Sequence, residues 1–445
     1  MEGKYDLIIL GSGQGGNPLA RAFASSGKKV LLIEKDQVGG TCINRGCTPT
    51  KTMVASAKAA YLVKKCADFG VEGSFHGVDI QKIIDRKNEI VTSFRASSQK
   101  KMEEMEHLDL IFDTARFLDP HTIALKNQTV SAPLIVINTG ARPMIPKEYE
   151  NIPYLDSTSI LDVDTLPKHL IVIGSSYIAL EFGQMFSRFG SKVTILARSD
   201  RIVTREDPDI STAMQEILQD EGIEFIFNAK VQEVSQEIEV TLEGGKKIQG
   251  THLLVATGRS PNTHELNLDK AGVKVDDKGF ISVDEKLQTS CPHIYAMGDI
   301  KGGPAFTHIS YDDYRILQDN LLKGENRSLK ERMVPYVVFT DPQLGRIGIS
   351  EEEAKAKNIP YKIHKIPMNY IARAIEIGRT EGLIKAVVCK DTNQILGCTV
   401  LGVEGGELMS MLEIAMMGNL TAEALQNAIF AHPTLAEGLN TLFTD

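Results

Sequence analysis

The chain has 445 residues, of which 42% are hydrophobic and 24% are charged, and its formal net charge at pH 7 is −9. This length predicts roughly three domains, and the negative charge argues against nucleic-acid and anionic-membrane partners while still allowing a local basic pocket for a phosphate. Six cysteines are too few and too scattered for a secreted disulfide scaffold, and no stretch approaches the ~20 apolar residues of a membrane span. We therefore expect a protein of the cytoplasm or of a matrix-like equivalent.

The N-terminal segment combines an apolar strand with a glycine-rich turn. Residues Tyr5–Leu10 form an apolar run, which predicts a strand buried on both faces of a parallel sheet rather than a signal peptide. A helical segment follows the turn, and then a second apolar run, Val30–Ile33, ends in Glu34. Glycines let the backbone approach a pyrophosphate at a helix N-terminus, and an acid after the second strand accepts from ribose hydroxyls. The sequence therefore predicts a dinucleotide-binding unit whose turn contains Gly11, Gly13 and Gly16.

Two cysteines, Cys42 and Cys47, follow this unit in the string GGTCINRGCTPTK. A straight α-helix would hold their Cα atoms about 8.6 Å apart, whereas a disulfide tolerates at most about 6.8 Å. A bonded pair therefore requires a bend, and Gly46 and Pro49 are the residues where the chain can bend. From this spacing alone, two unrelated buried thiols and, less readily, a metal-binding pair remain alternatives.

The segments up to residue 143 alternate between helix and strand signals. We expect helices at Thr50–Lys64 and Ile80–Met105, and strands at Leu110–Phe117 and Thr129–Ile137. The second helix is rich in charged residues and has one apolar stripe that should pack against the protein: Ile83, Ile84, Ile90, Val91 and Phe94. A turn that contains Thr139 and Gly140 closes the unit.

A second nucleotide-binding unit begins with the apolar strand Leu170–Ile173. Gly174 starts its turn, which is followed by a helix with Tyr177 and Glu181, by the strand Val193–Leu196, and later by Leu253–Val255 and Gly258. Arginines rather than an acid come after the second strand, and a ribose 2′-phosphate attracts arginine. Ordinary surface arginines are the alternative, but we interpret Arg198, Arg201 and Arg205 as a preference for NADPH over NADH.

The pattern of predicted helices and strands changes near Val334. Before that point, Thr289–Asp299 forms a strand and turn, and Pro304–His308 should start a helix. After it, the pattern predicts an α+β segment without a nucleotide signature, with strands at Tyr336–Phe339, Leu383–Cys389 and Ile395–Val400 and helices at Glu351–Lys357 and Gly406–Met417.

Taken together, the glycine turns, the cysteine segment and the segment Thr289–Asp299 resemble those of the class I pyridine nucleotide–disulfide oxidoreductases, which include glutathione reductase, dihydrolipoamide dehydrogenase and mercuric reductase. The resemblance covers the whole chain. It implies an α/β fold with two Rossmann-like dinucleotide-binding domains and a C-terminal α+β dimerisation domain. The expected domains are 1–145 for FAD with the redox disulfide, 146–262 for NAD(P), 263–333 for the second part of the FAD domain, and 334–445 for the dimer interface.

The resemblance also implies a role for individual residues. Cys47 would contact the flavin as the charge-transfer thiol, and Cys42 would attack the substrate. Lys51 would place a cation near flavin N5 with Glu181 as its partner, and Tyr177 would cover the nicotinamide pocket. The implied FAD-binding set is Gly11, Gly13, Gly16, Glu34, Lys51, Thr139, Gly140, Asp299 and His308, and the NADP-binding set, with NAD as the alternative, is Gly174, Tyr177, Glu181, Arg198, Arg201, Arg205 and Gly258. No metal ligands are expected.

A thiolate needs a base, and the C-terminal string Ala431–Glu437 supplies one. His432 can carry the proton, and Glu437 can orient its imidazole. In the family this histidine serves the cysteines of the partner subunit, so the resemblance implies a homodimer. The other cysteines are interpreted as core or surface thiols: Cys66, Cys291, Cys389 and Cys398.

The substrate is open among several branches of the family. Strings such as Gly174–Ser176 resemble mercuric reductases, but the final residues Asn440–Asp445 lack the cysteine pair that receives the metal, and mercuric reductases lack the histidine at 432. Dihydrolipoamide dehydrogenase has the histidine but prefers NAD, which Arg198 argues against. Glutathione reductase matches Tyr177 and Arg198, but no glutathione-binding set is recognisable.

Residues 306–315 also resemble reductases of hypothiocyanous acid. We therefore predict an NADPH-dependent flavin disulfide reductase in a mercuric-reductase-like subgroup, acting on a small disulfide or another thiol-reactive molecule. A non-catalytic, redox-sensing flavoprotein dimer is the alternative of a different class.

Overall fold

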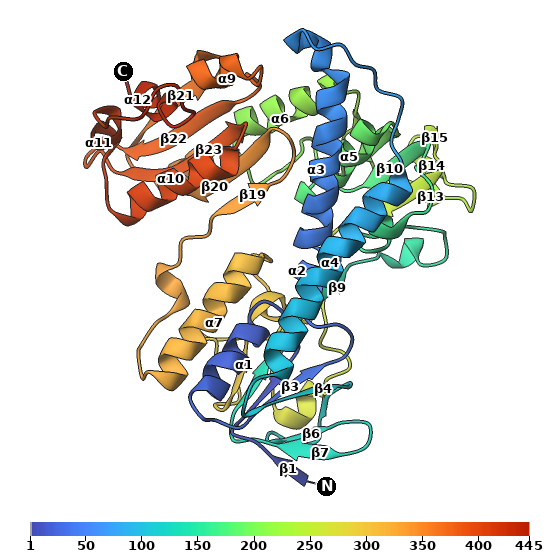
Figure 1. Cartoon of the computed structure of the whole chain (residues 1–445), viewed down its shortest axis with the longest axis vertical. Helices are drawn as coiled ribbons and strands as arrows, with labels where there is room; N and C mark the ends of the chain where they lie inside the picture. Colours follow the sequence, from blue (N-terminus) through green and yellow to red (C-terminus); the bar gives the residue numbers. More distant parts are fainter. Residues whose placement is uncertain (1, 445) are drawn as a thin grey trace.

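The computed structural model describes residues 2–444, which form three lobes around a pair of long helices (Figure 1). Met1 and Asp445, the ends of the first and last expected domains, lie outside the described residues. The long helices are α3 (Cys47–Lys64) and α4 (Ile80–Glu103), and the short α2 (Gly40–Arg45) precedes them. Met53 and Ala57 of α3 belong to one buried cluster with residues of the second and third lobes. Helix α3 is therefore the element on which these lobes meet.

The first lobe is built on a parallel sheet with the strand order β18-β8-β2-β3-β4. Its strands are β2 (Leu7–Leu10), β3 (Val30–Glu34), β4 (Leu108–Phe112), β8 (Ile135–Ile137) and β18 (Ile294–Ala296), and the helices α1 (Gly16–Ser25) and α7 (Thr307–Leu322) cover one face. Leu7 and Ile9 of β2 face these helices. Ile8 and Leu10 face a smaller sheet of β1 (Glu2–Lys4), β5 (Arg116–Phe117), β6 (Thr122–Ala124) and β7 (Thr129–Ser131). The first strand is thus buried on both faces, as the sequence predicts.

Two strands expected in this lobe are shorter in the structure than the sequence predicts. The stretch 110–117 is divided between β4 and β5, and 129–137 is divided between β7 and β8, with the two parts of each in different sheets. Pro133 lies at the second break, and a proline cannot donate to a strand ladder. At the first break, Asp113 accepts from the backbone of Thr114 and Lys126 and so stabilises a turn. Apolar residues on both sides of each break concealed the two turns.

The second lobe repeats the parallel arrangement with the order β12-β11-β10-β16. Its strands are β10 (His169–Ile173), β11 (Lys192–Leu196), β12 (Glu224–Ile226) and β16 (His252–Val255). Helices α5 (Tyr177–Phe189) and α6 (Pro208–Asp220) pack on one face, and the antiparallel strands β13 (Val231–Val234), β14 (Glu239–Leu242) and β15 (Lys247–Gln249) pack on the other. The structure confirms a second dinucleotide-binding unit of the Rossmann type.

A two-stranded ribbon joins the first and second lobes. It consists of β9 (Ala141–Pro143) and β17 (Arg259–Pro261), which pair antiparallel. These strands lie where the chain enters and leaves the second lobe. On this basis we propose the domain limits expected from the sequence at residues 145 and 262, and we propose the limit at 333 because the separate sheet of the third lobe begins at Tyr336.

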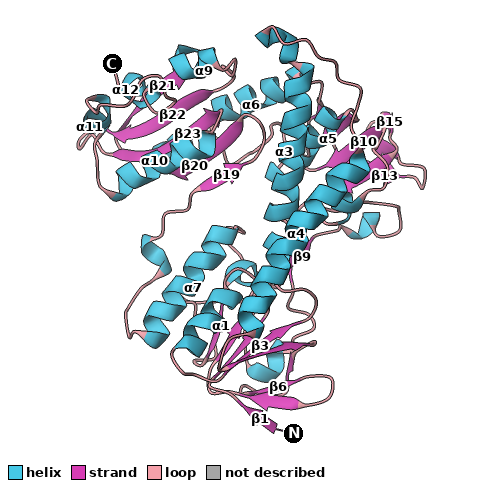
Figure 2. Ribbon diagram, viewed as in Figure 1, coloured by secondary structure: helices cyan, strands magenta, loops and turns pink. Residues whose placement is uncertain are grey.

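The third lobe is an antiparallel sheet with the order β19-β20-β23-β22-β21, and Figure 2 shows helix α10 against it. The strands are β19 (Tyr336–Val338), β20 (Gln343–Gly348), β21 (Tyr361–Pro367), β22 (Leu383–Cys389) and β23 (Ile395–Gly402). The helices are α8 (Glu351–Ala356), α9 (Ala372–Glu376), α10 (Gly405–Met417), α11 (Ala422–Gln426) and α12 (Gly438–Leu442). Large apolar side chains are exposed on this lobe, including Ile414 at 68%, Met417 at 66% and Ile429 at 100%. An apolar surface of this kind is typical of a protein interface.

The apolar stripe expected on α4 is only partly buried. Ile84 and Val91 are buried, but Phe94 is 54% exposed. The packed face of α4 is centred on Ile84, Lys87 and Val91, and Phe94 is turned about 60° away from Val91 around the helix axis. The inclusion of Phe94 in the stripe was therefore wrong. Among residues 2–444, no helix is both long enough and apolar enough to cross a membrane.

Candidate active site

The two cysteines lie on either side of a break between helices. Helix α2 ends at Arg45 and α3 begins at Cys47, and Gly46 between them has the non-helical angles φ −134° and ψ −111°. A Cβ atom at Gly46 would lie 3.0 Å from the Thr41 carbonyl oxygen, so the bend favours glycine. Pro49 does not bend the chain, because it lies in the first turn of α3, where a missing N–H breaks no helical hydrogen bond. The predicted bend is present, at Gly46 alone.

The cysteine side chains are thiols that hydrogen-bond to each other. The bond that Cys42 donates lowers the pKa of Cys47 to about 6, against the effect of burial, and the Thr307 hydroxyl and the Lys51 ammonium lower it further. The same bond, together with burial, raises the pKa of Cys42. The negative charge of the reduced pair therefore resides on Cys47.

Thr307, the first residue of helix α7, was not identified from the sequence as a site residue. Its Oγ1 lies 3.3 Å from the Cys47 Sγ atom. A hydroxyl that donates to a thiolate stabilises the charged form. A single threonine at a helix start is ordinary, so only the packing of α7 against the cysteine segment reveals its contact.

The expected ion pair between Lys51 and Glu181 is present. Lys51 Nζ donates to Glu181 Oε2 at 2.7 Å, and the Glu181 side chain is only 3% exposed. The second oxygen of Glu181 accepts from the Phe339 backbone N–H at 2.9 Å, and the Lys51 ammonium lies 4.7 Å from the centre of the Phe339 ring. Each oxygen of this buried carboxylate therefore accepts a hydrogen bond, which offsets the cost of its burial. The pair joins α3 of the first lobe to α5 of the second.

A cavity of about 660 Å³ extends from the glycine turn to these cysteines. This volume lies in the range of cofactor pockets, ~300–1,000 Å³. It contains most of the residues expected to bind FAD: Gly11, Gly13, Glu34, Lys51, Thr139, Gly140, Asp299 and His308, together with Cys42 and Cys47. The structure thus brings the cysteines and the first glycine turn to one cavity.

The turn after β2 requires glycine because side chains at Gly11 and Gly16 would collide with backbone atoms. The resulting bare backbone can approach a dinucleotide closely. A Cβ atom at Gly11 would lie 2.4 Å from the Asn138 carbonyl oxygen, and one at Gly16 would lie 2.2 Å from the Gly11 carbonyl oxygen. Gly16 does not line the cavity but lets α1 approach the turn. Glu34 accepts from the Ser12 backbone N–H at 2.9 Å and from its hydroxyl at 2.6 Å, and it also lines the cavity.

Asp299 lines the same cavity beside Arg259. Burial raises the pKa of Asp299, and the Arg259 Nε atom is 3.6 Å from its carboxylate. Arg259 Nε is buried and has no hydrogen-bond partner among the described protein atoms. A buried, unpartnered donor beside a carboxylate fits a polar ligand such as a ribityl chain. Arg259 was missed from the sequence, although it directly follows Gly258 in the motif that was recognised.

A second cavity, of about 1010 Å³, lies against the second unit. Gly174, Tyr177, Arg198, Arg205 and Gly258 line it. A Cβ atom at Gly174 would lie 2.3 Å from the Ala256 carbonyl oxygen, so this turn also requires glycine.

The three arginines expected beside this cavity do not all reach it. Arg198 and Arg205 are exposed on its lining. Arg201 is not part of the lining, and its guanidinium lies 3.4 Å from Glu352 of α8. The structure therefore brings two of the three arginines together.

An aromatic wall separates the two cavities. Tyr177, Phe306 and Tyr336 line both of them. The Tyr177 and Phe306 ring centroids are 5.9 Å apart, and Phe306 stacks on Tyr336 at 5.8 Å. Burial raises the pKa of Tyr177 to about 12, so its phenol stays neutral at ordinary pH. Phe306 and Tyr336 were not expected at the site, since aromatic residues at strand and helix starts are usually core residues.

His432 and Glu437 form the expected pair but lie apart from both cavities. The His432 Nδ1 atom is 2.8 Å from Glu437 Oε2, and the His432 side chain is 71% exposed. Neither residue lines the cavity that contains the cysteines of the same chain. The imidazole is thus held by Glu437 and is accessible at the surface of the chain.

Comparison with known proteins gives matches over nearly the whole chain. Residues 5–313 match a profile described as pyridine nucleotide-disulphide oxidoreductase, and residues 334–443 match its dimerisation domain. The chain is 37% identical to the probable pyridine nucleotide-disulfide oxidoreductase RclA of Escherichia coli (strain K12), over 99% of each chain. It is 35% identical to a mercuric reductase of Lysinibacillus sphaericus, over 98% of this chain and 82% of the relative. The solved structure of the HOCl-induced flavoprotein disulfide reductase RclA from Escherichia coli has a TM-score of 0.90 at 37% identity, over 99% of each chain.

Proposed function

The chain belongs to the pyridine nucleotide–disulphide oxidoreductase family, and from this membership we propose that it uses NADPH to reduce a small disulfide at Cys42. It is an FAD-dependent oxidoreductase with NAD(P)H as the electron donor, and its C-terminal residues form a dimerisation domain. The choice of NADPH, the substrate and the roles of individual residues are the proposal. The observation that carries it is the junction of Cys47, Thr307 and the Lys51–Glu181 pair in one cavity with the first glycine turn.

The residues of the two cavities would bind two different ligands. Gly11, Gly13, Glu34, Asp299 and His308 would hold FAD, with Thr139 and Gly140 and with Gly16 supporting the turn. The bound flavin would supply the two-electron relay between nicotinamide and disulfide. Gly174, Arg198, Arg205 and Gly258 would hold NADPH, with Tyr177 in the wall between the ligands.

The disulfide chemistry requires only the side chains of the protein. The Cys42 thiol loses its proton to a base and attacks one sulfur of the substrate RSSR, which forms a mixed disulfide and expels RS⁻. The protonated base returns the proton to this leaving thiolate and gives RSH. The Cys47 thiolate then attacks the Cys42 sulfur, restores the Cys42–Cys47 disulfide and releases the second RS⁻, which takes a proton from water. The sum is NADPH + H⁺ + RSSR giving NADP⁺ and two RSH.

We assign the base to His432 of the second subunit in a homodimer. The exposure of its imidazole and its hydrogen bond to Glu437 support this assignment, as does its absence from the lining of the cysteine cavity of its own chain. Glu437 would keep the ring oriented as proton acceptor.

A thiol oxidant is the second candidate substrate. The similar solved structure is titled an HOCl-induced flavoprotein disulfide reductase, and residues 306–315 resemble reductases of hypothiocyanous acid. Attack of Cys42 on the sulfur of HOSCN would form Cys42–S–SCN and water, and attack by Cys47 would then release thiocyanate and form the disulfide. Reduction of Hg(II) and of lipoamide are further alternatives, and a redox-sensing dimer without turnover is the alternative outside catalysis.

The proposed function is tested by cofactor analysis and a substrate panel. The purified protein should contain about one FAD per chain, identified by mass spectrometry, and NADPH should reduce it under anaerobic conditions. Initial rates are then measured with glutathione disulfide, lipoamide, hypothiocyanous acid and Hg(II), each with NADPH and with NADH. Turnover with none of them, in a protein whose flavin NADPH still reduces, would favour the sensing alternative.

Nucleotide choice gives the first mutational prediction. Arg198→Glu should raise the KM for NADPH by about 10- to 100-fold, because loss of a hydrogen bond to a charged group costs ~1.5–3 kcal/mol, and it should leave the KM for NADH nearly unchanged. Arg201→Ala is the matched control, since Arg201 does not line the cavity. Equal effects of the two substitutions on NADPH would show that these arginines do not read the 2′-phosphate.

The thiolate on Cys47 gives a pH prediction. A thiolate beside a flavin produces long-wavelength absorbance, which the reduced protein should retain above about pH 6 and lose below it, since the pKa of Cys47 is lowered to about 6. Lys51→Met should move the midpoint to higher pH by removing a cation that favours the thiolate. Lys58→Met on the same helix serves as control, because Lys58 pairs with Glu404 at 3.5 Å instead. A wild-type midpoint near the ordinary thiol pKa of ~8.5 would contradict the prediction.

A further inference from the structure

The loop after β11 contains a buried carboxylate, Glu206, beside the exposed Arg205. Glu206 is 1% exposed. Its Oε1 atom accepts a hydrogen bond from the Tyr336 hydroxyl and lies 3.7 Å from the Arg346 guanidinium. Its Oε2 atom is buried and has no hydrogen-bond partner among the described atoms, and burial raises the pKa of Glu206 to about 7. A carboxylate in such a place costs stability unless its position is required.

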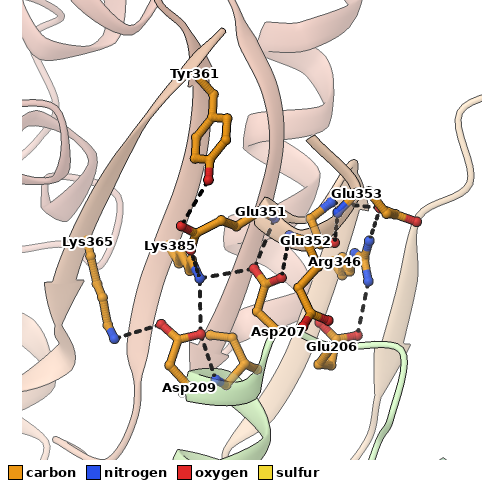
Figure 3. A network of polar contacts seen from close by, with 12 residues as sticks. Glu206, Asp207, Asp209, Arg346, Glu351, Glu352, Glu353, Tyr361, Lys365 and Lys385 are labelled. Carbon is orange, nitrogen blue, oxygen red and sulfur yellow. Dashed lines mark hydrogen bonds and ion pairs between the residues drawn. The ribbon is translucent and has the colours of Figure 1, made fainter. Parts of the chain in front are cut away.

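The same loop is fixed to the third lobe by further contacts (Figure 3). Arg346 donates to the backbone carbonyl of Arg205 at 2.6 Å. The Asp207 carboxylate accepts from the backbone N–H groups of Glu351 and Glu352, both at 3.1 Å, and lies 3.0 Å from the Lys385 ammonium. Arg205 is exposed and lines the second cavity, which Val203, Thr204 and the buried Glu206 of the same loop also line. The loop therefore holds an arginine at this cavity on a rigid support.

Tyr336 is the other end of the hydrogen bond to Glu206, and it lies in the wall between the two cavities. Its ring stacks on Phe306 at a centroid distance of 5.8 Å, with the planes 7° apart. Tyr336 thus belongs to the wall where the nicotinamide end would lie, and it is hydrogen-bonded to the loop that carries Arg205.

We propose that the Tyr336–Glu206 hydrogen bond fixes the distance between the phosphate-binding arginines and the aromatic wall, so that both are positioning residues for the whole NADPH molecule. This inference rests on the proposed function, because it presumes that NADPH occupies the second cavity. A ligand that touches both ends benefits from a preset separation, since less freedom is lost on binding. A ligand that touches only the arginines does not.

The test compares two ligands and two substitutions by isothermal titration calorimetry of the flavin-loaded protein. NADP⁺ spans both ends, whereas 2′,5′-ADP carries only the phosphate end. Tyr336→Phe removes one hydroxyl and keeps the ring, and Glu206→Gln keeps the shape and removes the charge. Tyr336→Phe should weaken NADP⁺ binding by about tenfold, in keeping with loss of one hydrogen bond to a carboxylate. Glu206→Gln should weaken it less, because the amide oxygen is a neutral and weaker acceptor, and each substitution should change 2′,5′-ADP binding by less than about twofold. The double variant should be no weaker than Tyr336→Phe, because Tyr336→Phe already removes the bond that Glu206→Gln only weakens.

Tyr361→Phe is the matched control. The Tyr361 hydroxyl also bonds a glutamate of this network, Glu351, at 3.3 Å (Figure 3), but Tyr361 lines neither cavity. It should leave the affinity for both ligands unchanged. Equal weakening of NADP⁺ and 2′,5′-ADP, additive effects in the double variant, or an unchanged NADP⁺ affinity would each overturn the inference. Failure of the wild-type protein to bind NADP⁺ or be reduced by NADPH would instead refute the proposed function.

Discussion

Replacement of His432 by alanine is expected to slow turnover with a disulfide by roughly 10²–10⁴-fold, the usual contribution of general acid–base catalysis, and to leave flavin reduction by NADPH nearly unchanged. The bond to Cys47 and burial raise the pKa of Cys42, so a base should assist the loss of its proton. Reduction by NADPH needs no such proton transfer. Stopped-flow measurement of the two half-reactions separates these effects.

Three controls define this result. Glu437→Gln should cause a smaller loss, because Glu437 orients the imidazole without carrying the proton. His264→Ala should change neither half-reaction, since His264 is an exposed histidine beside a glutamate, Glu265, at 3.7 Å, but lies in neither cavity. Hg(II) reduction, if present, should suffer less, because a metal ion leaves no thiolate to protonate. Equal slowing of both half-reactions would indicate damage to the dimer instead.

Subunit mixing then tests whether His432 acts on the partner. Co-expressed Cys42→Ser and His432→Ala subunits should form heterodimers with one intact site, in which Cys42 of one subunit meets His432 of the other. Such heterodimers should recover about half of the wild-type turnover per dimer, although both homodimeric variants are nearly inactive. No recovery would mean that each histidine serves the cysteines of its own chain.

Substitution of Cys42 or Cys47 is expected to have the second large effect. Cys42→Ser is expected to abolish disulfide turnover, because it removes the attacking sulfur, and to show long-wavelength absorbance without any reductant, because Cys47 is then a free thiolate of lowered pKa. Cys47→Ser should also abolish turnover but show no such absorbance. Cys66→Ser is the control and should retain both turnover and the wild-type spectrum. Absorbance in Cys47→Ser rather than in Cys42→Ser would mean that the two roles are exchanged.

The sequence alone determined the features that depend on neighbouring residues. The spacing of glycines around Gly11 and Gly174 predicted both nucleotide turns, since a Cβ atom at either position would meet backbone oxygen. The need for a bend between Cys42 and Cys47 followed from helix geometry, and Gly46 provides it. The pair of His432 and Glu437 was expected from a separation of five residues and is present. In each case a short segment contains the whole physical cause.

Only the tertiary structure decided which distant side chains share a surface. Arg201 and Arg205 look equivalent in the sequence, but packing of the loop against α8 turns Arg201 to Glu352 and leaves Arg205 at the cavity. Thr307 reaches Cys47, and Tyr336 reaches Glu206, because helix α7 and strand β19 are brought to them by long-range packing. Burial depends on the same packing, which is why the stripe on α4 excluded Phe94. Such contacts join residues far apart in the chain, and no local pattern of residues encodes them.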